Sequence, residues 1–283
     1  MDAEKDYSYF VILGGTSVIP HLSRSDVSLG DGTYQEESES DNWYVDFDTD
    51  FIPDEGKVIA RIPDYGTDSD VIVQYLETAI GVHENGGLSL DSLAKFNDSC
   101  DSTDTQCYET PPYCVSDNIG NTSSDCSPEN MYSVLSAANF ISFSGHGSTK
   151  GFWDNSRKYR KWYVDHFENV DLQTNHPVVN ALTPCDAGTI SDDDDEEDMN
   201  LSVEFMRAGA SNYISKLGSE GVCNMMLNLF PDSYLELEYT IGSAFFDSIR
   251  YTLIEDSAYG SPSTNYVQSG YLLLYGDPTL LLK

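Results

Sequence analysis

Short apolar runs alternate with amphipathic stretches along most of this chain. The apolar runs have the length of buried strands, and several end in glycine or proline, which close strands. They lie at 9–15, 57–63, 140–143, 178–182, 211–219 and 269–283. Long apolar runs without strict alternation are typical of strands that are covered on both faces, as in a parallel sheet.

The amphipathic stretches between these runs predict helices. The clearest is "DSDVIVQYLETAIGVHENGG", in which Val71, Tyr75 and Ala79 share one face with Thr78. Acidic residues at 68–70 begin this helix, and Asn-Gly-Gly at 85–87 ends it. Further helices are expected at 127–138, 201–210 and 241–255. Strand and helix thus alternate, which predicts an α/β fold: a mostly parallel sheet with helices on both faces.

Two segments interrupt the alternation. Residues 31–56 are acidic and predict a long loop, with a possible hairpin around "WYVDF" at 43–47. The cysteine-rich stretch at 89–127 predicts an irregular loop around a short strand at 113–115, with the cysteines themselves at about 98–127. We therefore expect an N-terminal α/β subdomain over 1–87, either complete or truncated, and a larger subdomain over 88–283.

The charge of the chain limits its partners. It has 48 acidic residues against 14 basic ones, a net charge of −34. Nucleic acids and anionic membranes bind to clustered lysine and arginine, so neither is an expected partner, whereas cationic substrates are favoured. No run reaches the roughly 20 apolar residues of a membrane span. Seven consecutive carboxylates at Asp192–Asp198 predict a mobile segment or a structural calcium site.

Six cysteines indicate the compartment. Four of them, Cys100, Cys107, Cys114 and Cys126, are spaced too widely for the C-x2-C pairs of structural zinc, so two disulfides are expected. This favours an extracellular or cell-surface location. The chain has no signal peptide and opens directly on a strand, which predicts a domain of a longer precursor. Cys185 and Cys223 are left over.

Two strand ends carry candidate chemistry. The run at 140–143 is followed by Ser-Gly-His-Gly with His146, and the run at 178–182 by Thr-Pro-Cys with Cys185. If these strands are neighbours, the imidazole can activate the thiol and protonate a leaving amine. The backbone N–H groups of Gly147 and Cys185 could then bind the oxyanion. Alternatively, His146 only hydrogen-bonds backbone, and Cys185 is a small buried apolar residue.

"FISFSGHGSTKGFW" followed by "PVVNALTPCDAG" resembles the gingipain-type cysteine peptidases, which share a clan with caspases, legumain and clostripain. The likeness extends to "YFVILGGTSVIP", "SDNWYVDFDTDFIPDEGKVIARIP", "SVEFMRAGASNYISKLGS" and "YGDPTLLL" in the family's order. The resemblance implies a caspase-like three-layer α/β sandwich and endopeptidase activity that needs no cofactor. It assigns His146 as acid and base, Cys185 as nucleophile and Gly147 as oxyanion donor.

The resemblance also implies a deep pocket for the residue before the scissile bond, the P1 residue. Its walls would include Thr183, the stretch from Ser215 to Glu220, and Trp153. Glu220, if it points inward, could pair with arginine or lysine at P1; a solvated loop glutamate is the alternative. The family's acidic residues before the histidine strand have no clear counterpart, because this region is short and cysteine-rich here.

Three functions follow from these observations. The first is a cysteine endopeptidase that cleaves protein or peptide substrates, with a preference for arginine or lysine at P1. The second is a catalytically inactive module of the same fold that serves binding or scaffolding in a larger extracellular protein. The third is a disulfide-stapled, calcium-binding domain without chemistry. Reactivity of the Cys185 thiol distinguishes the first from the others.

Overall fold

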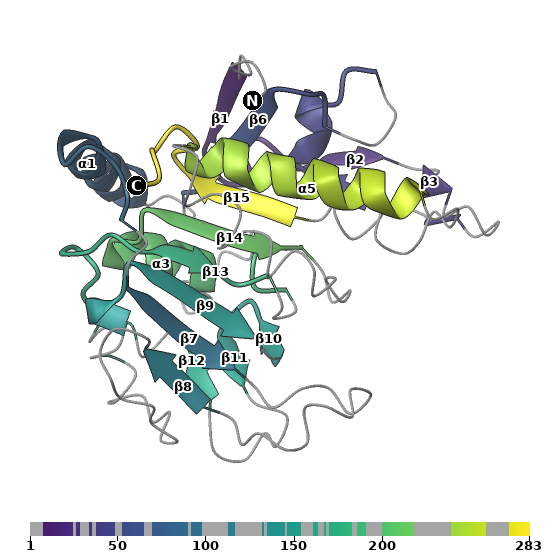
Figure 1. Ribbon diagram of the computed structural model, residues 1–283. Coiled ribbons are helices and arrows are strands. Elements are labelled where there is room, and N and C mark those ends of the chain that lie inside the picture. Colours follow the sequence, from purple (N-terminus) through teal and green to yellow (C-terminus); the bar gives the residue numbers. More distant parts are fainter. Residues whose placement is uncertain are drawn as a thin grey trace.

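The computed structural model (Figure 1) describes twelve longer stretches of the chain and some isolated residues and short strands between them. The described residues are 8–24, 27–28, 34–35, 38–48, 53–64, 70–89, 92–97, 113–116, 132, 135–144, 146–153, 161–163, 167, 170–182, 186–190, 200–217, 239–258 and 272–283.

An eight-stranded sheet forms the centre of the fold. Its strands, in spatial order, are β1 (Ser8–Leu13), β6 (Lys57–Ile62), β15 (Leu272–Gly276), β14 (Asn212–Lys216), β13 (Val178–Asn180), β9 (Phe140–Ser144), β7 (Leu93–Asn97) and β8 (Tyr113–Ser116). Most neighbouring pairs are parallel, whereas β15 is antiparallel to β14 and β8 to β7. Figure 1 shows β1 and β6 at one end of the sheet and β7 and β8 at the other.

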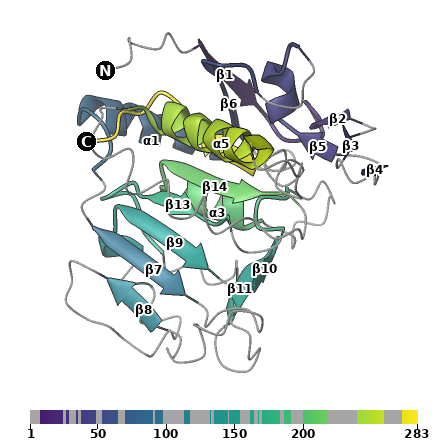
Figure 2. The same cartoon turned by 45° about the vertical axis from the view of Figure 1, so that its right-hand side comes forward.

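Helices cover both faces of the sheet (Figure 2). On one face, α1 (Asp70–Glu84) and α3 (Leu201–Ala208) pack on a core that includes Phe205 and Tyr213. On the other, α5 (Ile241–Ala258) packs on a core that includes Phe245 and Ile214. Tyr213 and Ile214 are consecutive in β14 and enter opposite cores, as the side-chain alternation of a strand requires. The predicted mostly parallel sheet with helices on both faces is therefore confirmed.

The sequence pattern locates α1 within one or two residues. Val71, Tyr75, Thr78 and Ala79 are buried, as predicted, and the chain leaves the helix through Gly86 and Gly87. Both glycines have positive φ, 79° and 119°, a conformation that side chains with a Cβ resist. The predicted helix at 127–138 lies largely outside the described residues. Within this range, the described residues 132 and 135–137 are helical.

Three expectations about the strands were wrong in part. The run at 9–15 forms β1, but it lies at the sheet edge, and Val11 and Leu13 are 42% and 52% exposed. The segment around "WYVDF" forms a 3-10 helix, η1 (Asn42–Val45), and no hairpin. The predicted irregular stretch at 89–127 contains β7, a full strand parallel to β9, besides the short strand β8.

Short strands complete the N-terminal part of the chain. β2 (Leu22–Arg24) pairs with β5 (Ser38–Ser40), and β3 (Val27–Ser28) with β4 (Tyr34–Gln35), both antiparallel. The strands of both predicted subdomains share the eight-stranded sheet. The boundary at residue 87 stays a prediction.

A buried ion pair ties the start of η1 to β6, and the same arginine also binds the loop after β1. The Arg61 side chain is fully buried, and its Nε and Nη2 donate to the Asp41 carboxylate at 2.8 and 2.5 Å. Its Nη1 donates to the carbonyls of Gly14 and Ile19 at 3.0 and 2.8 Å. His21 Nδ1 lies 2.9 Å from Asp41 Oδ1. The guanidinium is thus bound along its whole fork, the geometry in which arginine pairs are strongest.

The Asp41–Arg61 pair predicts acid sensitivity. Desolvation raises the pKa of the Asp41 carboxyl, but the bonds from Arg61 and His21 outweigh it, so the pKa lies below its ordinary value. A lowered folded-state pKa contributes stability above the unfolded-state pKa of about 3.9, and this is lost as the pH falls through the folded-state value. Asp41→Asn leaves Arg61 buried and uncompensated, so we expect a loss of about 3–5 kcal/mol in the free energy of unfolding at pH 7.

Denaturant unfolding between pH 7 and pH 2 measures this. The Asn variant is expected to show a shallower decline below pH 4 than the wild type. Glu39→Gln removes an exposed carboxylate two positions away and is the control. A loss of less than about 1 kcal/mol in Asp41→Asn would contradict the assigned role.

Candidate active site

The two strands that precede His146 and Cys185 are hydrogen-bonded neighbours. β9 and β13 are parallel, with Val178 opposite Phe140 and Asn180 opposite Ser142. Their carboxyl ends therefore lie at the same edge of the sheet, where sites form in parallel sheets. His146 follows two residues after the end of β9, and Cys185 follows five residues after the end of β13. The condition for the predicted dyad, adjacent strands, is met, while Cys185 itself lies outside the described residues.

His146 begins a small antiparallel sheet at this edge. The sheet consists of β10 (His146–Ser148), β11 (Gly151–Trp153) and β12 (Lys161–Tyr163). The register places Trp153 opposite His146 and Phe152 opposite Gly147. The structure thus brings the backbones of His146, Gly147 and Trp153 together in one hairpin, whereas the sequence had placed His146 only after a strand end.

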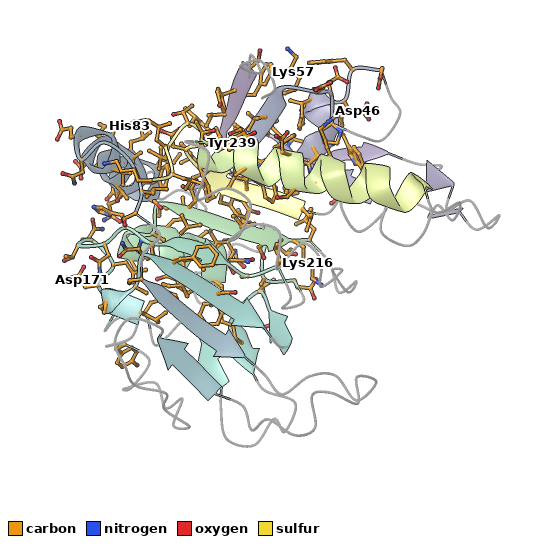
Figure 3. The ribbon with its side chains drawn as sticks, in the orientation of Figure 1. Asp46, Lys57, His83, Asp171, Lys216 and Tyr239 are labelled. Atoms are coloured by element: carbon orange, nitrogen blue, oxygen red, sulfur yellow. The ribbon has the colours of Figure 1, made fainter. Side chains whose placement is uncertain are left out.

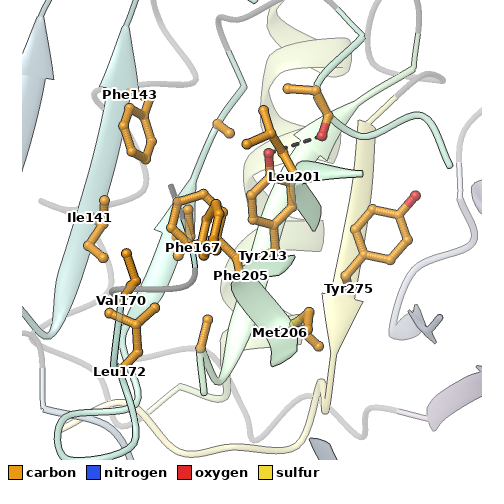
Figure 4. Close-up of a cluster of buried hydrophobic side chains, with 14 of the residues drawn as sticks. Ile141, Phe143, Phe167, Val170, Leu172, Leu201, Phe205, Met206, Tyr213 and Tyr275 are labelled. Carbon is orange, nitrogen blue, oxygen red and sulfur yellow. Dashed lines mark hydrogen bonds between the residues drawn. The ribbon is translucent and has the colours of Figure 1, made fainter. Parts of the chain in front are cut away.

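Aromatic stacking fixes this hairpin to the central sheet. The ring of Phe152 in β11 stacks on that of Phe143 in β9, with centroids 4.1 Å apart and planes at 24°. Phe205 of α3 lies 5.8 Å from Phe143 and 6.4 Å from Phe152. Figure 4 shows Phe143, Phe205 and Tyr213 in one buried cluster. Offset-stacked aromatic pairs stabilise beyond their buried area, so the backbone beside Gly147 has a rigid support.

The chain directly after Cys185 forms a second rigid element, the post-cysteine turn (residues 186–190). The Gly188 N–H donates to the Lys216 carbonyl at 3.0 Å, and a Cβ at Gly188 would lie only 2.7 Å from that oxygen. Glycine is required here because the turn backbone approaches β14 closely. Asp186 has φ of 53°, in the left-handed region that is strained for residues with a side chain.

Comparison with known proteins identifies the family. The family model described as peptidase family C25 matches residues 1–283, the full sequence. The chain belongs to peptidase family C25. This membership confirms the predicted gingipain-type family. A search of curated protein sequences gave no match.

Solved structures with the same fold include members of this family. The Arg-specific cysteine proteinase gingipain R is 14% identical, with a TM-score of 0.63 over 98% of this chain and 64% of that chain. A complex of the pro- and mature domains of RgpB from Porphyromonas gingivalis is 14% identical, with a TM-score of 0.61 over 98% and 66%. A structure described as a protease is 13% identical, with a TM-score of 0.65 over 96% and 64%.

These similarities support the fold assignment. Identities of 13–14% show a shared fold, and the predicted caspase-like α/β architecture is confirmed. The chain spans less than two thirds of the length of each of these structures. A search among the described helices finds none that combines the length and the hydrophobicity of a membrane span.

The predicted pocket of the C25 fold is only partly described. Ser215 is fully buried, and its hydroxyl donates to the Ala181 carbonyl at 3.0 Å, so it connects two strands and lines no solvent-exposed wall. Lys216, at the end of β14 (Figure 3), is 1% exposed. Thr183 and Glu220 lie outside the described residues, as does the Trp153 side chain, so their place in a pocket stays a prediction.

One group of described residues could hold a metal ion. Asp46, Asp48 and Asp54 each offer a carboxylate oxygen, and these oxygens lie within 4.8 Å of one another. Two oxygens on opposite sides of a calcium ion, each about 2.3–2.6 Å away, are separated by about this distance. Figure 3 shows Asp46 beside η1, away from β9 and β13.

Two other sequence predictions concern residues that the structure does not describe. The acidic run at Asp192–Asp198 lies outside the described residues, and so do the cysteines except Cys114 in β8.

Proposed function

We propose that this protein is a cysteine endopeptidase in which Cys185 is the nucleophile and His146 the acid and base. The observation that carries the proposal is the parallel pairing of β9 with β13 in a chain of family C25. A free thiol has a pKa near 8.5 and is mostly protonated at neutral pH. An imidazole from the neighbouring strand end raises the thiolate fraction and stores the proton that the leaving amine needs.

The reaction follows from these roles. The Cys185 thiolate attacks the scissile carbonyl carbon, and the charge that develops on oxygen is bound by the N–H groups of Gly147 and Cys185. His146 protonates the leaving amine as the carbon–nitrogen bond breaks. Water, deprotonated by His146, then hydrolyses the thioester and frees the thiol. Such an oxyanion site needs fixed backbone, and the stacking of Phe152 on Phe143 supports the strand that faces Gly147.

Substrates are proteins or peptides, and we propose a preference for arginine or lysine at P1. The net charge of −34 supports attraction of cationic substrates. Within the pocket, Glu220 is the proposed partner of the P1 cation, and Thr183 and Trp153 are proposed walls. Trp153 lies opposite His146 in the hairpin register, which keeps the Trp153 backbone next to the proposed catalytic histidine and supports Trp153 as a pocket wall.

The location and a structural ion are further parts of the proposal. We propose an extracellular or cell-surface location, which the cysteines between Cys100 and Cys126 support, because disulfides persist in oxidising compartments. We also propose that Asp46, Asp48 and Asp54 hold a structural calcium ion. The chemistry of the thiol needs no cofactor, so this ion would stabilise the loop after η1 and take no part in catalysis.

A library of fluorogenic peptides varied at P1 tests the activity. We expect turnover with arginine or lysine at P1 and a loss of kcat on the order of 10⁴-fold or more in Cys185→Ala and in His146→Ala. Glu220→Gln is expected to lower kcat/KM about 10- to 100-fold for cationic P1 only, since one charge-assisted bond is lost. Cys223→Ala is the matched control and keeps full activity. Turnover that survives in Cys185→Ala would refute the dyad, and a wild type without turnover would favour the inactive module.

Thermal unfolding with and without calcium tests the ion site. At a concentration 100 times its Kd, bound calcium adds about 2.7 kcal/mol to the free energy of unfolding. We expect the melting temperature to rise with calcium and to fall after chelation, and Asp54→Asn to abolish this response. Glu55→Gln, an exposed neighbour outside the cluster, is the control and keeps the response. An equal calcium response in wild type and Asp54→Asn would exclude this site.

A further inference from the structure

Two buried tyrosine hydroxyls bind the backbone of the post-cysteine turn. We propose that Tyr213 and Tyr275 are positioning residues for catalysis. They hold the turn after Cys185 and thereby fix the position of the Cys185 thiol and of the Cys185 backbone N–H. This inference rests on the proposed function, since it gives a role to residues that act through Cys185. Neither tyrosine contacts the reacting atoms in this scheme.

The contacts are direct. The Tyr213 hydroxyl donates to the Ala187 carbonyl at 3.0 Å, the bond dashed in Figure 4, and the Tyr275 hydroxyl donates to the Gly188 carbonyl at 2.5 Å. Tyr213 and Tyr275 are opposite each other in the pairing of β14 with β15, and their ring centroids are 6.3 Å apart. Two adjacent strands thus present two donors to two consecutive carbonyls.

Both hydroxyls are permanent donors. Each side chain is fully buried, and desolvation raises the pKa of both phenols above the ordinary tyrosine value. For Tyr275 the neighbouring Asp41 carboxylate raises the pKa further. Neither group therefore ionises in the pH range in which a cysteine peptidase works. The attachment of the turn stays constant while the thiol and the imidazole titrate.

Two backbone N–H groups of the post-cysteine turn are also bound. The Gly188 N–H donates to Lys216, and the Thr189 N–H donates to the Asp186 carbonyl at 3.0 Å. With both tyrosine bonds, the turn is tied to β14 and β15 at three points within two residues. A catalytic group has to be held within about 0.5 Å of its productive position, and such ties supply that precision. The strained φ of Asp186 indicates that surrounding contacts over-determine this backbone.

Tyr75 offers a matched control within the same core. It is fully buried, like the other two, and its hydroxyl donates to a backbone carbonyl, that of Ser211, at 2.8 Å. The same hydroxyl accepts a hydrogen bond from the Asp277 backbone N–H. Ser211 directly precedes β14, whereas the Gly188 bond to Lys216 lies at the last residue of that strand. Loss of the Tyr75 hydroxyl thus removes the same kind of buried bond, together with the one from Asp277, at the opposite edge of the sheet.

Steady-state kinetics of Tyr213→Phe, Tyr275→Phe and Tyr75→Phe in the full chain test the proposal. Each change deletes one oxygen atom and keeps the ring. Because a displacement of about 1 Å can cost 100-fold, we expect Tyr213→Phe and Tyr275→Phe to lower kcat about 10- to 100-fold with KM within about twofold. Tyr75→Phe loses two buried hydrogen bonds, so it is expected to lose at least as much stability and still to keep kcat within about twofold. Rates are measured under conditions in which circular dichroism shows that each variant is folded.

Two kinetic results would overturn the proposal. One is a wild-type kcat in both Tyr213→Phe and Tyr275→Phe while Cys185→Ala is inactive. This result would remove the role of the tyrosines and leave the proposed dyad standing. The other is an equal loss of kcat in Tyr75→Phe, which shows general destabilisation. Turnover in Cys185→Ala overturns the proposed function itself.

Hydrogen exchange of the wild type gives a test that needs no variant. The Gly188 and Thr189 amides are expected to be protected like those of β14, and rapid exchange of these amides would contradict a held turn.

Discussion

The parallel pairing of β9 with β13 is the constraint on which the rest of the candidate site depends. Hydrogen bonds between these strands bring two segments, His146 and the residues before Cys185, to one edge of the sheet. Closing the loop between these segments costs conformational entropy. Burial of apolar side chains offsets this cost, and Ile141, Val178 and Val179 are fully buried. The proposed dyad therefore depends on how the sheet is assembled.

The same aromatic core supports both halves of the site. Phe205 packs near Phe143 and Phe152 on the histidine side and lies 5.5 Å from the ring of Tyr213 on the cysteine side. Tyr213 then passes this support to the post-cysteine turn through its hydroxyl. Because protein cores are close-packed, a shift on one side is transmitted to the other. Residues remote from the substrate are thus expected to affect catalysis through geometry.

The sequence predicted the elements whose burial matches their pattern, and it failed where tertiary context decides. The helix over 70–84 and the strands before His146 and Cys185 have clear apolar periodicity, so they were found. β7, "LAKFN", is short and contains polar residues, so its pairing with β9, distant in sequence, determines it. β10, "HGS", has only three residues and no apolar pattern, so its pairing with β11 determines it. The tyrosine bonds were missed because their acceptors are 26 and 87 positions away.

The most direct test of the account is the pH dependence of Cys185 alkylation by iodoacetamide, followed by mass spectrometry in wild type and His146→Ala. A thiolate stabilised by the imidazole gives a titration of the wild type well below pH 8.5, and loss of the histidine returns it to that ordinary value. This is the result that the account predicts. The same titration near pH 8.5 in both proteins would show that the paired strands bring no imidazole to the thiol, and it would contradict the proposed dyad.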